Sequence, residues 1–188
     1  IETELKAAIE SSALPTKASA DEYGRFDKGL AYTVLMKYYM EAGEWANAEA
    51  CGRELMKPEY GYDLMEHYAD IFTLENEQNK EIIFACVEQR GVSLQLWHDH
   101  ALPGNYPVTN TAIQRWDGYK VPWAFYHTFE SGDERLQSLV GEYVGSDGVE
   151  FNEAYDKTIH STIYGQGAVP VKYGEDPNST GDGSQIDW

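Results

Sequence analysis

Large aromatic side chains are concentrated in one long segment, residues 88–120, in which no hydrophobic periodicity is visible. Tryptophan and tyrosine rings can stack on the apolar face of a pyranose, while nearby amide, carboxylate, imidazole and guanidinium groups can bond its hydroxyls. The side chains that we expect to contact such a ligand are Trp97, His98, Tyr106, Arg115, Trp116 and Tyr119. Asn105 and Asp117 are further polar groups of the same segment. Alternatively, any of these rings could pack beneath the loop as a separate small core, because tryptophan and tyrosine are often substantially buried.

Two segments carry groups that could bind a metal ion. The sequence His98-Asp99-His100 could chelate a metal, but no third ligand has a suitable spacing, so an ordinary polar loop is the preferred interpretation. Residues 176–183 contain the oxygen donors of a calcium loop but lack the glycine and glutamate positions of an EF-hand, which favours a flexible turn. We therefore predict no bound metal and no cofactor.

Acidic side chains are so numerous, at 32 Asp and Glu, that carboxylate pairs of the glycosidase type arise without functional meaning. Glu130, Asp133 and Glu134 form one such cluster, and we interpret Asp133 with Arg135 as a structural ion pair. No serine or cysteine nucleophile signature and no glycine-rich phosphate loop is present. The sequence therefore predicts no catalytic residues.

The composition restricts the classes of ligand. The chain has 188 residues, enough for one domain with a sizeable core, and 13% of them are aromatic. Its formal net charge is -18, which would repel nucleic-acid phosphates and anionic lipid headgroups. Neutral ligands, or partners with basic patches, are compatible with this charge.

Two cysteines, Cys51 and Cys86, both stand in apolar stretches, and we expect both to be buried free thiols. No apolar run of about 18 residues is present, so no membrane span is predicted. The sequence begins at Ile1 without an initiator methionine or a signal peptide, and we interpret it as an internal segment of a longer protein.

The clearest elements are helices near the beginning of the sequence. A short helix is expected from Glu2 to Ser11, followed by a second over 25–42, whose apolar residues recur three and four apart, with Asp21 as its N-cap. Gly43 is typical of a left-handed helix end, and another helix follows from Glu44 to Met56. Together these predict an antiparallel helical hairpin over residues 24–57.

The remainder predicts less regular structure. We expect a buried strand over 81–87, a helix near 121–130, a strand over 136–144 that returns through residues 146–149, and a loop-rich tail from Gly165. We therefore divide the chain into a helical scaffold, residues 1–80, and a loop-rich ligand-binding part, residues 81–188, both within one domain.

The hairpin sequence Ala42-Gly43-Glu44-Trp45 resembles the middle of a tetratricopeptide repeat, in which a glycine turns the chain and an aromatic side chain wedges between the helices. The wider series of motifs resembles the SusD/RagB family in order along nearly the whole chain. Besides the hairpin, the matching segments are residues 14–15, 24–29, 60–64, 68–72, 79–85, 132–135 and the closing Val171-Lys172-Tyr173 with Asp187-Trp188.

This resemblance implies a mainly α fold: a SusD-like α-α superhelix scaffold with an irregular, loop-rich part and a few short strands. It also implies a non-catalytic surface lipoprotein of Bacteroidetes that binds oligosaccharide at the outer membrane. The implied partner is a SusC-like TonB-dependent transporter, to which the glycan is delivered. Membrane association would come only through a lipid anchor that lies outside this segment.

Two alternatives remain at this stage. The helical repeat could instead bind a partner peptide, because repeat hairpins form concave recognition surfaces; a glycoside hydrolase is less favoured. The position of the exposed rings discriminates between the two binding functions: rings on the hairpin favour a peptide, and rings within 88–120 favour a saccharide.

Overall fold

The computed structural model describes residues 1–181 and 183–187, and its contacts divide the chain into two compact units. The first unit comprises residues 1–66 and 78–87, and the second comprises 67–77 and the chain from 88 onward. The chain thus crosses between the units around residues 67, 78 and 88, on both sides of the boundary that we predicted at residue 80. That the second unit is the ligand-binding part remains a prediction.

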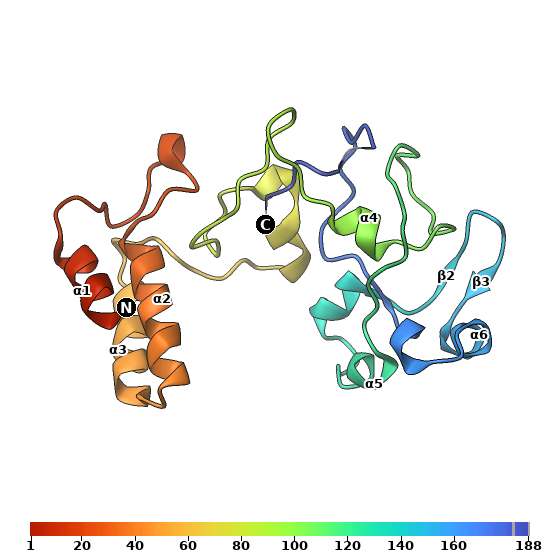
Figure 1. Cartoon of the computed structure of the whole chain (residues 1–188), viewed down its shortest axis with the longest axis horizontal. Coiled ribbons are helices and arrows are strands. Elements are labelled where there is room, and N and C mark those ends of the chain that lie inside the picture. The colour runs from red at the N-terminus through yellow and green to blue at the C-terminus, as the bar shows by residue number, and fades with distance from the viewer. Residues whose placement is uncertain (182, 188) are drawn as a thin grey trace. The chain divides into compact units, whose positions relative to one another are not determined.

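Three helices form the first unit: α1 (Glu2–Glu10), α2 (Lys28–Glu41) and α3 (Trp45–Leu55), with a 3-10 turn η1 (Ala20–Glu22) before α2 (Figure 1). Gly43 lies between α2 and α3 with φ of +73°, which confirms the predicted left-handed turn. The buried residues between the helices include Leu35, Tyr39, Ala48 and Cys51. The helical hairpin with its glycine turn is therefore present, whereas Trp45 is 67% exposed and does not wedge between the helices as the tetratricopeptide resemblance implied.

The N-cap of α2 differs from the prediction. Asp27, in an extended conformation, accepts a hydrogen bond from the Leu30 amide at 2.8 Å, whereas Asp21 lies inside η1. Asp27 is preferred because its carboxylate also accepts from the Ala18 amide at 2.9 Å, which holds the preceding loop.

The strand predicted over 81–87 does not form. No strand of the described residues pairs with this segment, and only Ala85 of it is buried. An apolar run without a partner cannot complete a ladder of backbone hydrogen bonds, so it remains irregular. Cys86 is consequently exposed and our expectation of burial was wrong, while Cys51 is buried as predicted.

The second unit is built from short elements. They are η2 (Tyr68–Phe72), η3 (Leu74–Asn76), α4 (Trp97–Ala101), α5 (Trp123–Tyr126), η4 (Glu134–Ser138), β1 (Leu139–Val140), β2 (Tyr143–Val144), β3 (Glu150–Phe151), α6 (Glu153–Ile159), η5 (Ile163–Gly165) and β4 (Val169–Pro170). Antiparallel β1–β4 and β2–β3 pairs make two small sheets, and the predicted return through residues 146–149 is the turn of the β2–β3 hairpin.

Two predicted elements of this unit are shorter than expected. The helix near 121–130 is limited to α5, because the next amides, of Thr128 and Phe129, bond three residues back in turns. The strand over 136–144 is split at Gly141 and Glu142 into β1 and β2, which pair with different strands. No described helix has the length and hydropathy of a membrane span.

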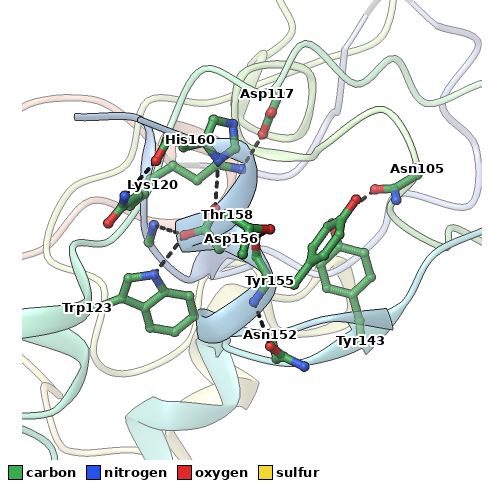
Figure 2. A network of polar contacts seen from close by, with 12 residues as sticks. Asn105, Asp117, Lys120, Trp123, Tyr143, Asn152, Tyr155, Asp156, Thr158 and His160 are labelled. Atoms are coloured by element: carbon green, nitrogen blue, oxygen red, sulfur yellow. Dashed lines mark hydrogen bonds and ion pairs between the residues drawn. The ribbon is translucent and has the colours of Figure 1, made fainter. Parts of the chain in front are cut away.

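Two apolar clusters form the core of the second unit. One contains Leu102, Ile113 and Val169, and the other contains Trp123, Phe151 and Ala168. Asp156, which is fully buried beside the second cluster, accepts from the Trp123 indole at 2.7 Å, from the Gly167 amide at 2.9 Å and from His160 at 2.8 Å (Figure 2). These bonds connect α5, α6 and the residue Gly167 just before β4.

Candidate functional site

A short turn of chain, residues 116–119, is clamped onto the carbonyl groups of α4. The Trp116 amide donates to the Asp99 carbonyl at 2.6 Å, and the Gly118 and Tyr119 amides donate to the His100 carbonyl at 2.6 and 2.9 Å. These bonds satisfy carbonyls that a helix end leaves without intrahelical donors. A Cβ on Gly118 would stand 3.1 Å from the His100 oxygen, so a glycine suits this close approach.

This clamp brings four rings into contact, which we call the aromatic platform: Trp97, His100, Trp116 and Tyr119. His100 meets Trp116 edge-on at 4.9 Å between centroids and lies 5.2 Å from Tyr119, and Trp97 lies 5.6 Å from Tyr119. Trp116 is 50% exposed and Tyr119 is 44% exposed. The platform therefore presents ring surface to solvent on a backbone that α4 holds in place.

Hydrogen bonds also hold the orientation of the platform rings. The Trp97 indole donates to the Pro170 carbonyl at 3.3 Å, and the Trp116 indole donates to the Gln114 side-chain oxygen at 3.1 Å. Asp117, at a positive φ of 57°, forms an ion pair with Lys120. Rings fixed in this way lose little conformational freedom when they bind a ligand.

Three of the six predicted site residues belong to the platform: Trp97, Trp116 and Tyr119. His98 is only 4% exposed, and its Nε2 lies 2.9 Å from the carbonyl of Tyr173, whose ring contacts Trp97. The predicted polar loop around His98 is in fact helix α4, one face of which is buried. His100 was not among the predicted contacts. Its position two residues after His98, within the same aromatic segment, is the feature of the sequence that could have indicated it.

The remaining two predicted residues, Tyr106 and Arg115, contact each other, and neither ring-contact nor hydrogen-bond partners link their side chains to the platform rings among the described residues. Tyr106 packs on Tyr143 at 5.0 Å, and burial raises the pKa of its hydroxyl. The Arg115 guanidinium donates to the Tyr106 carbonyl at 2.7 Å. Tyr106 packs against the cluster of Leu102, Ile113 and Val169, and a ligand contact of Tyr106 or Arg115 stays a prediction.

A half-buried cation lies near the platform. The Lys172 ammonium stands 4.3 Å from the centre of the Phe72 ring, and burial lowers its pKa. The neighbouring Tyr173 ring meets Trp97 at 5.7 Å. The ring contacts thus continue from the platform into the interior of the unit.

The loop that contains the calcium-like sequence is held by protein groups. The Asn110 side-chain amide donates to the carbonyls of Asp176, Pro177 and Ser179, and the buried Asp176 carboxylate accepts from the Asn178 and Gln185 amides. Position 182 of this loop lies outside the described residues. Within residues 1–181 and 183–187, no group of three or more His, Cys, Asp or Glu side chains is arranged to hold a metal ion.

The carboxylate cluster after α5 contains the expected ion pair. Arg135 contacts Asp133 at 2.5 Å, and the guanidinium lowers the pKa of this carboxyl to about 2. Asp133 therefore stays ionised at any physiological pH, which is the opposite of the raised pKa that a glycosidase acid requires.

No protein-family model matches the sequence, and no curated protein matches it significantly. Solved structures are nevertheless similar. Surface glycan-binding protein A from Bacteroides thetaiotaomicron has a TM-score of 0.71 at 17% identity, over 99% of this chain and 44% of that chain. Surface glycan-binding protein A from Bacteroides fluxus has a TM-score of 0.71 at 16% identity, over 98% and 41%. A SusD superfamily protein from Bacteroides fragilis has a TM-score of 0.66 at 16% identity, over 99% and 42%.

The chain has a SusD-like fold. This confirms the fold that the ordered motifs predicted, although Trp188 of the closing motif lies outside the described residues. The SusD-like chain spans less than half the length of these structures.

Proposed function

We propose that the protein binds an oligosaccharide on the aromatic platform and carries out no chemistry on it. The observation that carries the proposal is the pair of exposed rings, Trp116 and Tyr119, held in fixed orientation by α4 and His100. Such rings match the apolar face of a sugar, and the Asp117 and Gln114 side chains beside them can accept hydrogen bonds from its hydroxyls.

Structures of the same fold support this class of ligand. One similar structure is surface glycan-binding protein A in complex with laminarihexaose, and another contains a xylogluco-oligosaccharide. The shared fold extends the proposal to the longer protein: a surface lipoprotein of the outer membrane that belongs to the SusD/RagB family and passes glycan to a SusC-like TonB-dependent transporter.

The test is calorimetric titration of the chain with laminarihexaose and with a xylogluco-oligosaccharide. Trp116→Ala should weaken binding by about five- to thirtyfold, since it removes about 1–2 kcal/mol of ring stacking. The matched control is Trp45→Ala, which removes another exposed tryptophan, on α3. Unchanged affinity in Trp116→Ala and Tyr119→Ala would show that the platform is not the site.

A second candidate function, recognition of a partner peptide, is favoured by a different surface. The α2–α3 hairpin carries an open apolar groove of about 470 Å³, lined by residues that include Met36, Met40, Trp45 and Met56. Trp45 is 67% exposed and Met56 is 81% exposed. If Trp45→Ala rather than Trp116→Ala abolished binding of a natural ligand, this second function would be preferred.

A further inference from the structure

A second hollow lies in the same unit, between α5, the segment from η4 to β1, and the first residue of α6. Its volume is about 430 Å³, and none of the platform rings lines it. The residues that matter for its chemistry are Trp123, Tyr126, His127, Gln137, Glu142 and Glu153.

Aromatic groups form one wall of the hollow. The Trp123 and His127 rings stack at 6.3 Å with an interplanar angle of 30°, and Tyr126 meets Trp123 edge-on at 5.5 Å. Trp123 is held by the buried Asp156, so this wall is rigid (Figure 2). Leu139 and Val140 of β1 also line the hollow, and thus apolar surface is available on more than one side.

A glycine creates the space that the Tyr126 hydroxyl occupies. A Cβ on Gly141 would stand 2.8 Å from the Tyr126 hydroxyl oxygen. This hydroxyl makes no hydrogen bond with any residue of 1–181 or 183–187, although it can both donate and accept. The hollow therefore contains an uncommitted polar group in front of an aromatic wall.

The charge around the hollow is largely compensated. Glu153 accepts from Lys157 at 2.6 Å and lies 2.8 Å from His127, and these contacts lower its pKa. Glu142 is exposed and has no ion-pair partner in the described part of the chain, and the Gln137 amide is exposed beside it. The available partners are thus one hydroxyl, one amide and one carboxylate beside apolar walls, which suits a neutral polyhydroxylated ring better than a polycation.

We propose that this hollow is a second saccharide site, which binds a neutral sugar through Tyr126, Gln137 and Glu142. The proposal rests on the proposed function for the class of ligand, but its residues are separate from those of the platform. A basic amine is the competing ligand, because Glu142 could pair with it.

The experiment is titration of the full 188-residue chain with laminarihexaose, followed by the backbone amide signals of Gly141 and Tyr126 in NMR spectra. The same titration is done with a chain that carries Trp116→Ala and Tyr119→Ala. We expect the Gly141 and Tyr126 signals to respond in both proteins. Tyr126→Phe should weaken the affinity measured from the Gly141 signal by about three- to tenfold, which corresponds to the loss of a hydrogen bond. Tyr164→Phe is the control, because Tyr164 is an exposed tyrosine outside the hollow.

Each outcome separates the two proposals. If the platform signals respond and those of Gly141 do not, the second site is wrong while the proposed function stands. If Gly141 responds and the platform variant binds as well as the original chain, the second site stands and the platform does not. If neither responds to laminarihexaose or to a xylogluco-oligosaccharide, both are wrong. The proposal would also be overturned if the chain bound spermidine, lost that binding in Glu142→Gln, and showed no response to either saccharide. In that case the ligand of the hollow would be a basic amine.

Discussion

At the scale of single residues, Asp156 shows why a buried charge can be kept in a small unit. Its carboxylate has no exposed surface, yet it accepts from Trp123, Gly167 and His160, which come from separate parts of the second unit. A buried carboxylate is tolerated only when such donors replace the water it has lost. Since Trp123 also lines the second hollow, Asp156 orients a ring of its wall.

Replacement of Asp156 by alanine should therefore be strongly destabilising. We expect the free energy of unfolding to fall by about 2–5 kcal/mol, because the Trp123 indole and the Gly167 amide lose their acceptor within the unit. Urea unfolding followed by tryptophan fluorescence measures the change. Asp156→Asn should recover part of the loss and the exposed Glu130→Ala should cost little; a loss below about 0.5 kcal/mol for Asp156→Ala would contradict this account of the network.

At the scale of elements, the two units are built by different means. The helices α2 and α3 are long enough to bury a continuous face against each other, with a glycine at positive φ between them. The elements of the second unit are too short to be stable alone, and hydrogen bonds with the loops, from backbone amides as well as side chains, hold them. The clamp of residues 116–119 on α4 is one example, and the three carbonyls held by Asn110 are another.

The cap of α2 provides a test at this scale. Asp27→Ala should cost about 1 kcal/mol through the loss of the bond to the Leu30 amide, and more because the Ala18 amide loses its acceptor too. Asp21→Ala is the matched control, since it changes the aspartate that lies outside the helix. Thermal unfolding followed by helical circular dichroism would distinguish them; equal effects of the two variants would refute the assignment of the cap.

At the scale of the whole molecule, two exposed surfaces differ in chemistry. The groove on the hairpin is apolar and methionine-rich, whereas the platform of the second unit combines rings with hydrogen-bonding groups. Large apolar surfaces are typical of contacts between proteins, and mixed surfaces are typical of polar ligands. The formal net charge of -18 favours neutral or basic ligands on either surface.

The hairpin groove should make this chain bind a hydrophobic dye and self-associate at high concentration. Introducing charge with Met40→Glu and Met56→Glu should reduce the dye fluorescence by about half or more and shift the sedimentation profile toward the monomer. Leu64→Glu, at an exposed leucine that does not line the groove, is the control. A dye-silent monomer before any substitution would show that the groove is not an association surface.

The sequence by itself determined the features that depend on near neighbours along the chain. The period of apolar residues within 25–42, the glycine at position 43 and the residues around Trp45 are local signals, and they were sufficient for the hairpin. The SusD-like fold was predicted from the ordered series of motifs along nearly the whole chain. The concentration of rings in residues 88–120 was also visible, because it is a matter of composition.

Only the tertiary structure decided which of those side chains reach solvent. Burial depends on partners that are distant in sequence: His98 is covered because Tyr173 lies against it, and Trp116 is exposed because the α4 carbonyls hold its backbone. For the same reason the apolar run 81–87 is not a strand and Cys86 is exposed, since no strand or bridge within residues 1–181 and 183–187 pairs with this run. Local pattern sets which element can form, and long-range contacts set which faces remain free to bind.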